Sequence, residues 1–291
     1  MQQRLISAAV IAVVVVTLFV LGPPWLTLGI ALLAALAAYE TAKLATSAGL
    51  PTPVWFPVIV APIAVIGLSW ALESDLGASA LALVAPAIAV VIMLAAIVAF
   101  RVQDTAVGLR SWIGTVFASL YPSLLAFAAA FVGLTPQSQT SSLFGLHLDF
   151  GRILLLILVL TVWTVDSGAY LSGRTFGRRK MSPHISPNKT WEGAIGGTIA
   201  GIVVCTVLAA GTDVTYALGA ALGLVIAVFG QAGDLAESVL KRAAGAKDSG
   251  TLIPGHGGFL DRVDSFLFAA PAMYATLAVY GLVVTSSASF T

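Results

Sequence analysis

Residues 79–100 read Ser-Ala-Leu-Ala-Leu-Val-Ala-Pro-Ala-Ile-Ala-Val-Val-Ile-Met-Leu-Ala-Ala-Ile-Val-Ala-Phe, an apolar run without a charged side chain. The hydrocarbon core of a bilayer is about 30 Å thick, and a helix needs about 20 mostly apolar residues to cross it. This run is therefore long enough for a transmembrane helix. Similar runs predict further spans over residues 5–22, 25–42, 53–72, 112–134, 152–173, 193–210, 214–233 and 265–285.

The composition supports an all-α integral membrane protein, a polytopic bundle of about nine transmembrane helices. Of the 291 residues 59% are hydrophobic and 9% charged, and the mean hydropathy is +1.00. A soluble domain typically has about 45–50% apolar and about 25% charged residues. The net charge of +1 gives no large basic field, so we expect no nucleic-acid partner. The single cysteine, Cys205, excludes an internal disulfide and a cysteine-based zinc cluster.

The distribution of basic residues predicts the orientation of the chain. Cytoplasmic loops carry an excess of lysine and arginine. With the N-terminus inside, all of the 14 Lys and Arg residues except Arg152 fall on the cytoplasmic side. We therefore predict a cytoplasmic N-terminus in a multi-pass protein of the cell (plasma) membrane.

The segment 234–264 concentrates acids, bases and glycines. Asp234, Glu237, Ser238 and Lys241 fall at i, i+3, i+4 and i+7 on one helix face, and Asp261 and Asp264 would share the face of another helix. Carboxylates at two helix ends could then converge on a cation, and oxygen ligands without cysteine suit Mg²⁺. Phosphoryl chemistry also needs cationic groups, here Lys241, Arg242, Lys247 and Arg262, and glycines that let the backbone approach a phosphate, here Gly257 and Gly258 beside His256.

A simpler interpretation of this segment is a solvated loop. Glu237 and Lys241, four residues apart, would then be an ordinary pair on a helix surface. Spacing alone leaves both interpretations open.

Two other segments carry polar groups at the same predicted face of the membrane. Ser186-Pro-Asn-Lys-Thr-Trp-Glu-Gly193 stands just before a predicted helix and could bind an anion there. The basic residues of 178–180 more simply enforce topology or contact anionic lipid. Asp166 lies inside a predicted span, where an unpartnered acid costs several kcal/mol, so it is a functional candidate, with a structural hydrogen bond to Ser167 as the alternative.

Glycine pairs in two predicted helices allow close helix packing. These are Gly197 with Gly201 and Gly219 with Gly223. Such pairs would also fit a homodimer, although they are common in membrane helices.

The stretch from Ser238 to Asp264 resembles the signature of the phosphatidate cytidylyltransferases, also called CDP-diacylglycerol synthases. Its elements are Ser238-x-Leu-Lys-Arg242, Lys247-Asp248-x-Gly250 and Ile253-Pro-x-His-Gly-Gly-Phe-x-Asp-Arg-Val-Asp264. The segment 186–193 looks like a second motif of this family, with Asn188 in place of the usual lysine. The segment around Asp166 is similar to a third.

The resemblance implies transfer of the cytidylyl group of CTP to phosphatidate, giving CDP-diacylglycerol and pyrophosphate in phospholipid biosynthesis, with Mg²⁺ as cofactor. It implies that Asp234, Asp261 and Asp264 hold the metal. The other implied catalytic residues are Lys241, Arg242, Lys247, Asp248 and Arg262. The implied substrate-binding residues are Asp166, Ser186, Asn188, Lys189, Thr190, Ser238, His256, Gly257 and Gly258.

We therefore expect one membrane domain over residues 1–291. Residues 1–151 would be a helical scaffold, and residues 152–291 the catalytic half, with cytoplasmic loops 174–192 and 234–264. Membrane lipids would surround the chain.

Other functions are compatible with parts of the sequence. The nearest are a cytidylyltransferase or a CTP-dependent kinase that acts on an isoprenoid lipid. A secondary transporter would use Asp166 and Asp234 as an ion path, but it predicts broken helices in two related halves, and the polar residues gather in one half. A noncatalytic lipid-binding or scaffold protein would not need the acids of 261–264.

Overall fold

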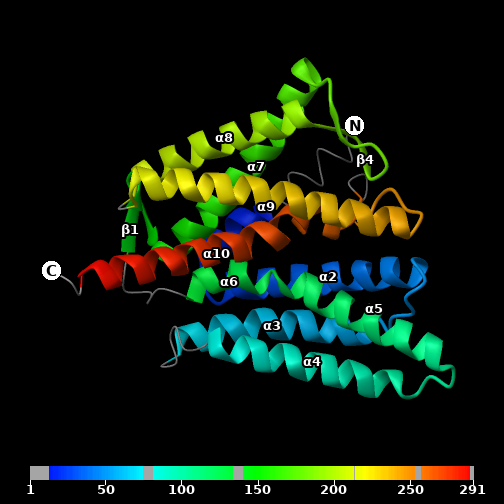
Figure 1. The fold of residues 1–291 in the computed structure, drawn as a ribbon. Coiled ribbons are helices and arrows are strands. Elements are labelled where there is room, and N and C mark those ends of the chain that lie inside the picture. Colours follow the sequence, from blue (N-terminus) through cyan, green and yellow to red (C-terminus); the bar gives the residue numbers. More distant parts are fainter. Residues whose placement is uncertain (1–12, 75–80, 134–139, 213, 253–256, 289–291) are drawn as a thin grey trace. The chain divides into compact units, whose positions relative to one another are not determined.

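The computed structural model describes residues 13–74, 81–133, 140–212, 214–252 and 257–288. These form long helices and two short antiparallel hairpins (Figure 1), which confirms the all-α polytopic prediction. The helices are α2 (Trp25–Ser47), α3 (Trp55–Glu73), α4 (Val84–Ala99), α5 (Thr105–Ser123), α6 (Ala126–Gly133), α7 (Phe150–Phe176), α8 (Trp191–Ala210), α9 (Tyr216–Ala243) and α10 (Leu260–Ala288). The strands are β1 (Thr140–Leu143), β2 (Leu146–Asp149), β3 (Lys180–Ser182) and β4 (Ser186–Thr190).

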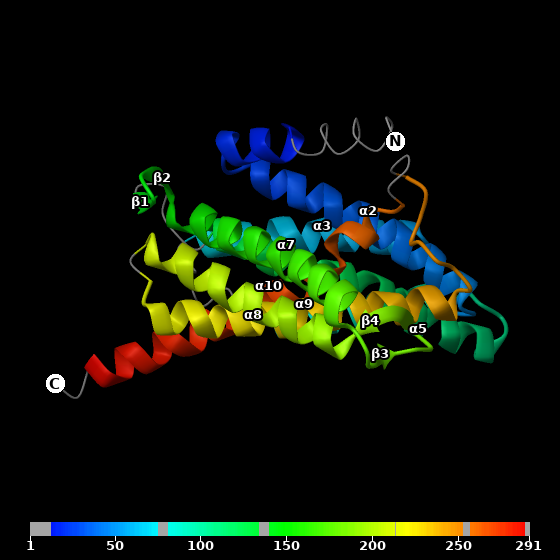
Figure 2. The same cartoon turned by 90° about the horizontal axis from the view of Figure 1, so that it is seen from above.

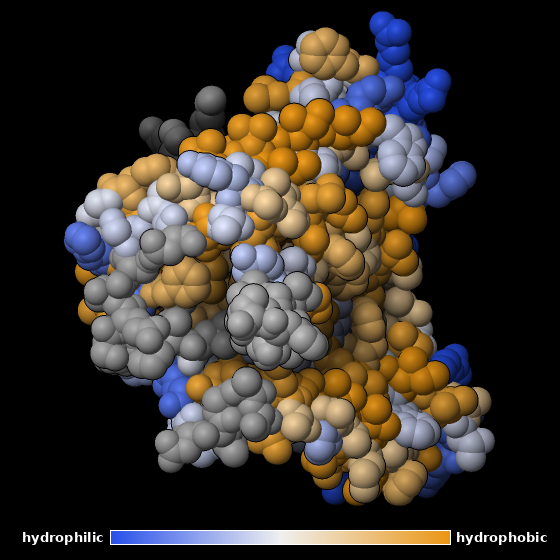
Figure 3. Space-filling view, turned by 60° about the vertical axis from the view of Figure 1, so that its left-hand side comes forward, coloured by the Kyte–Doolittle hydropathy of each residue, from blue (hydrophilic) through white to orange (hydrophobic). Residues whose placement is uncertain are grey.

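Within the described residues, eight helical segments are long and apolar enough to cross a membrane. They match eight of the predicted spans. The remaining span, 5–22, is helical over residues 13–21, and its residues 5–12 lie outside the described residues. Hydrophobic side chains cover much of the surface in Figure 3, as expected of a protein surrounded by lipid.

One predicted span, 112–134, is divided in the structure. It begins earlier, at Thr105, where the side chain of Asp104 caps α5 by accepting hydrogen bonds from the amides of Ala106 and Val107. It breaks between α5 and α6, just after Pro122. The two helices still form one candidate membrane span, Thr105–Gly133.

The chain divides into two compact units. Unit 1 comprises Met1–Pro136 and Ala236–Asp264, and unit 2 comprises Gln137–Leu235 and Ser265–Thr291. Helix α9 therefore runs from unit 2 into unit 1, and α10 runs back. The division does not follow the boundary at residue 151, and the expected scaffold and catalytic halves stay a prediction.

In unit 1, α2 packs against α3, α5 and α6, and α4 packs against α5. The packed face of α2 is rich in buried alanines, among them Ala34, Ala38 and Ala45. Small side chains let helices approach closely where lipid tails provide no hydrophobic driving force between them. One charged residue, Glu40, lies on this buried face.

In unit 2, α7 packs along α8, and the two hairpins lie at opposite ends of α7 (Figure 2). The glycine pairs serve this packing. A Cβ at Gly197 would come within 2.7 Å of the carbonyl oxygen of Val165 on α7, and one at Gly223 on α9 would meet Ile202 of α8 at the same distance. The pairs therefore have a role inside the chain, and the homodimer stays a prediction that these contacts do not support.

Two helices extend beyond the apolar runs that predicted them. Helix α9 continues past residue 233 to Ala243, and α10 begins at Leu260 rather than at 265. Ser238, Lys241, Arg242, Asp261, Arg262 and Asp264 thus lie on the ends of membrane helices, whereas Lys247 and Asp248 lie between α9 and α10.

Candidate active site

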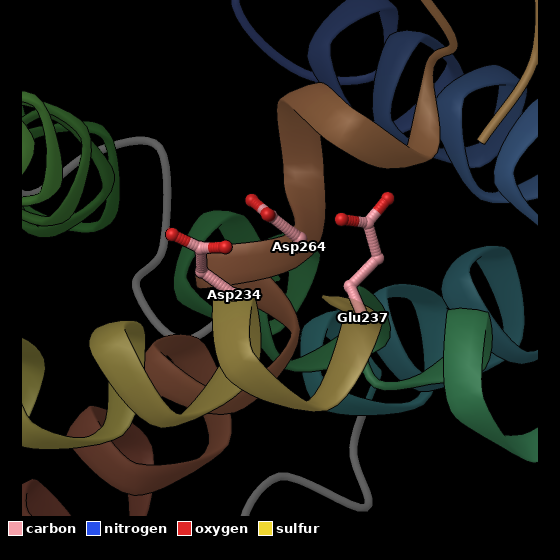
Figure 4. A group of neighbouring side chains, drawn as sticks. All are labelled: Asp234, Glu237 and Asp264. Atoms are coloured by element: carbon pink, nitrogen blue, oxygen red, sulfur yellow. The ribbon is translucent and has the colours of Figure 1, made fainter. Parts of the chain in front are cut away.

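Three carboxylates meet where α9 and α10 approach one another. Each of Asp234, Glu237 and Asp264 has an oxygen within 4.8 Å of an oxygen of the other two. Glu237 and Asp264 belong to unit 1, and Asp234 precedes Glu237 by about one turn of the unbroken helix α9. Figure 4 shows the three side chains, which we call the acidic trio.

Glu237 is the buried member of the acidic trio. Its side chain is fully buried, and Oε1 has no hydrogen-bond partner among the described residues. Oε2 forms an ion pair with Lys241, one turn further along α9. A buried carboxylate oxygen without a partner is costly, so this atom is well suited to receive a cation.

Lys241 lies between two acids. In addition to its ion pair with Glu237, its Nζ donates a hydrogen bond of 2.7 Å to Oδ1 of Asp261. The predicted metal ligand Asp261 is thus occupied by a lysine, and the third member of the acidic trio is Glu237. The sequence placed Glu237 on the same helix face as Asp234, but it was not among the predicted metal ligands.

The other oxygen of Asp261 organises the signature loop. Oδ2 accepts hydrogen bonds from the backbone amides of Ser249, at 3.0 Å, and Gly258, at 2.9 Å. It also lies 3.0 Å from the hydroxyl of Ser249. Gly257 has φ +82°, a left-handed conformation that favours glycine, and a Cβ there would come within 2.8 Å of the same oxygen.

A residue of α2 reaches the same loop. Oε2 of Glu40 accepts a hydrogen bond of 2.8 Å from the hydroxyl of Ser249 and another of 2.8 Å from the amide of Leu260. Glu40 lies in the region predicted to be a scaffold and was not a predicted site residue. The signal was present, because an acid within a transmembrane run is a functional candidate by the same reasoning that selected Asp166.

Unit 2 contains a second polar group around Asp234. Nζ of Lys189, on β4, lies 2.6 Å from Oδ2 of Asp234, so two predicted site residues form an ion pair. Asp166, exposed on α7, interacts electrostatically with both. The sequence predicted these three as members of one site.

The remaining predictions from segment 186–193 have different surroundings. Thr190 is buried, and its hydroxyl caps α8 by accepting a hydrogen bond of 3.1 Å from the amide of Gly193. Ser186 is half-buried in β4, and Asn188 is exposed. The cap gives Thr190 a structural task, while its binding role stays a prediction.

Three of the predicted catalytic cations lie at the surface. Arg242, Lys247 and Arg262 are exposed, as is Asp248, whereas Ser238 is buried beside Glu237 on α9. His256 lies outside the described residues. The exposed cations are therefore accessible to a charged substrate.

The acidic trio fits a hard divalent cation. Mg²⁺ prefers oxygen ligands and usually takes one or two carboxylates, with its other positions left to water and phosphate. The trio offers carboxylate oxygens only, one of them buried and unpartnered. Of the predicted metal ligands, the structure brings together Asp234 and Asp264.

Comparison with known proteins places these features in a family. A Bacillus subtilis protein named phosphatidate cytidylyltransferase is 46% identical to this chain, over 45% of this chain and 50% of the relative. A Brucella suis protein of the same name is 45% identical, over 48% of this chain and 53% of the relative. A relative of that name from Haemophilus influenzae is 40% identical, over 52% of this chain and 53% of its own length. The matched part of the chain thus spans about half the length of these curated relatives. A sequence model of the cytidylyltransferase family matches residues 2–280, nearly the whole chain, and the protein therefore belongs to the cytidylyltransferase family.

Proposed function

We propose that the protein transfers the cytidylyl group of CTP to phosphatidate and releases CDP-diacylglycerol and pyrophosphate. The observation that carries this proposal is the acidic trio beside Lys241, in a chain of the cytidylyltransferase family. The printed names of the relatives supply the substrate class. The signature residues around the trio supply the charges that a nucleotide and a lipid phosphate require.

The reaction needs positioning and charge neutralisation rather than a protein nucleophile. A phosphate oxygen of phosphatidate attacks the α-phosphorus of CTP and forms a new P–O bond. The bond from the α-phosphorus to the oxygen that bridges to the β-phosphate breaks, and pyrophosphate leaves with that electron pair. Catalysis of this kind rests on holding the two phosphates in line and on stabilising the negative charge.

Asp234, Glu237 and Asp264 would hold Mg²⁺. When bound, the ion neutralises phosphate oxygens and aligns the reacting groups. Asp261 has a different task in this proposal, because it holds Lys241 beside Glu237 and organises the loop that contains Gly257 and Gly258. Lys241 then balances the charge of two acids that would otherwise repel each other.

The exposed cations would bind the nucleotide. Arg242, Lys247 and Arg262 lie on or next to the helix ends that carry the acidic trio, where they can contact the triphosphate and the leaving pyrophosphate. Within unit 2, Lys189 pairs with Asp234 and would offer a positive group to a substrate phosphate. Asp166 would orient this lysine.

The proposed location is the cytoplasmic face of the cell membrane. The polar ends of α9 and α10 belong to segments that the basic-residue bias assigns to the cytoplasm. CTP would then arrive from water and phosphatidate from the bilayer.

The proposal is tested with purified protein, radiolabelled CTP and a panel of lipids. The panel contains phosphatidate, an isoprenoid-ether lipid phosphate and a polyprenol. We expect labelled CDP-diacylglycerol from phosphatidate, loss of this product with EDTA, recovery with Mg²⁺, and loss in the Asp264→Asn variant. Turnover restricted to the isoprenoid phosphate or to the alcohol would reject the assignment.

A further inference from the structure

A carboxylate from the first half of the chain lies at the centre of the signature loop. Glu40 on α2 is 1% exposed, and its Oε2 accepts hydrogen bonds from Ser249 and Leu260, more than two hundred residues away in the sequence. We propose that Glu40 is a positioning residue: it fixes the signature loop and the start of α10 so that Asp261 holds Lys241 beside Glu237. This inference rests on the proposed function, and all of its contacts lie within unit 1.

Counting donors and acceptors assigns the Ser249 hydroxyl to Glu40. A hydroxyl has one hydrogen to donate, and this oxygen lies 2.8 Å from Glu40 and 3.0 Å from Asp261. Asp261 already accepts from Lys241 and from two backbone amides. Among the residues that the structure describes, Oε2 of Glu40 has one other donor, the amide of Leu260. The Ser249 oxygen in turn accepts a hydrogen bond of 3.3 Å from the amide of Asp261, so this side chain links the two acids.

Two signature glycines are in contact with Glu40. A Cβ at Gly250 would collide with Oε1 of Glu40, and one at Gly258 would collide with Oε2 of Glu40 and the hydroxyl of Ser249. Because both glycines lack a Cβ, they leave room for the Glu40 carboxylate. The signature sequence and this side chain of α2 fit each other in shape, and Oε2 of Glu40 also accepts hydrogen bonds from the loop.

The contacts continue from Glu40 to the acidic trio. Ser249 connects Glu40 to Asp261, Asp261 connects to Lys241, and Lys241 pairs with Glu237. A shift of the loop would move Asp261 and release Lys241. A misplacement of about 1 Å in an active site can lower turnover by about 10²-fold, so a residue that only holds the loop can have a large effect on rate.

The experiment compares three variants of Glu40 with a matched control. Glu40→Gln retains one oxygen that can accept both hydrogen bonds, Glu40→Asp retains the charge but withdraws the oxygens, and Glu40→Ala removes the acceptor. The control is Thr41→Ala, because Thr41 is the next residue, is also buried, and donates its hydroxyl hydrogen bond to the carbonyl of Ala37 in its own helix. The readouts are kcat, KM for CTP, and Tm.

We expect Glu40→Ala to lower kcat by about 10²-fold, with KM for CTP changed by less than about threefold. Glu40→Gln should keep kcat within about threefold of the wild type, and Glu40→Asp should fall between the two. A structural role alone would lower Tm and leave kcat intact, as expected for Thr41→Ala. If Glu40→Ala does not fold, the other two variants decide: an impaired Asp with an active Gln supports positioning, and the reverse order overturns it.

A double-mutant cycle with Ser249→Ala tests the route of the effect. If Glu40 acts through Ser249, the double variant should have a kcat within about twofold of the worse single variant. If the fold-losses in kcat of the two single variants multiplied in the double variant, the proposal would be overturned. A wild-type kcat in Glu40→Ala would overturn it as well. If the wild type itself does not use phosphatidate, the proposed function fails, and Tm values of the same cycle still test the contact. Additive changes in Tm for the two substitutions would then show that Glu40 and Ser249 are not coupled.

Discussion

Lys241 and Asp261 form an ion pair with 2.7 Å between Nζ and Oδ1, and the same ammonium pairs with the fully buried Glu237. One lysine thus lies between two acids that the chain brings from different helices. The arrangement leaves Asp264 and Asp234 to complete the acidic trio with Glu237.

The first prediction concerns this lysine. Lys241→Met should lower turnover by at least about 10²-fold, because it leaves Glu237 buried without a compensating charge and frees Asp261. It should also lower Tm. Turnover is measured with CTP and phosphatidate in detergent. The control is Lys43→Met, which removes an exposed lysine whose ammonium lies 4.5 Å from the ring centre of Tyr39. Equal rates in the two variants would contradict the proposed role.

The second prediction separates metal ligands from positioning acids. Glu237→Gln and Asp264→Asn should raise the Mg²⁺ concentration for half-maximal rate by about tenfold or more, because each removes a charged oxygen from the acidic trio. Asp261→Asn should lower kcat but leave this concentration within about twofold, since its oxygens are occupied by Lys241 and the loop. The measurement is initial rate against Mg²⁺ concentration at saturating CTP.

If all three variants raised the Mg²⁺ concentration for half-maximal rate by a similar factor, Asp261 would also be a metal ligand. A direct control uses Mn²⁺ binding in the absence of nucleotide. This readout does not depend on turnover, so it also tests the acidic trio in slow variants.

The helices of this protein could be predicted from sequence because apolar length alone determines which segments cross a bilayer. The ends of the helices were predicted less well. The apolar run that predicted α10 begins at 265, but helix formation continues through the charged residues from Leu260. The break after Pro122 also needed the structure, because proline is tolerated within many membrane helices.

The site was predictable where its residues lie at helical spacing or in the signature. The pair of Glu237 with Lys241 was predictable from its i, i+4 spacing, but the partners that the acids find on other elements were not, because they depend on which helices pack together. Asp261 and Lys241 are twenty residues apart, and Glu40 and Ser249 are separated by 209 positions. Local patterns carry no information about such contacts.

The third prediction uses the close contact between Glu40 and Gly250. The three nearest atoms to a Cβ at Gly250 all belong to the Glu40 side chain. Gly250→Ala should therefore destabilise the protein by about 1–3 kcal/mol through overpacking, as measured by denaturant or thermal unfolding. In the Glu40→Ala background the added methyl group has space, and the same substitution should cost little.

A control for the change from glycine to alanine is Gly67→Ala, because a Cβ there has no neighbour within 4 Å among the described atoms. This variant should be neutral or slightly stabilising. A cost at Gly250 that is unchanged when Glu40 is shortened would show that the clash is not with this side chain.

The last prediction concerns the ion pair of Lys189 and Asp234, with 2.6 Å between Nζ and Oδ2. Both side chains are partly exposed, so the pair itself should add little to stability, and Lys189→Met should change Tm only slightly. If the lysine contacts a substrate phosphate, the same variant should raise KM for CTP or phosphatidate, or lower kcat, by about tenfold or more, because a charge-assisted hydrogen bond is lost. His184→Ala, at an exposed position in the turn of the same hairpin, should leave the rate within about twofold, since no binding role is assigned to it. A Lys189→Met variant with normal kinetics and lower Tm would instead make this pair a structural link between β4 and α9.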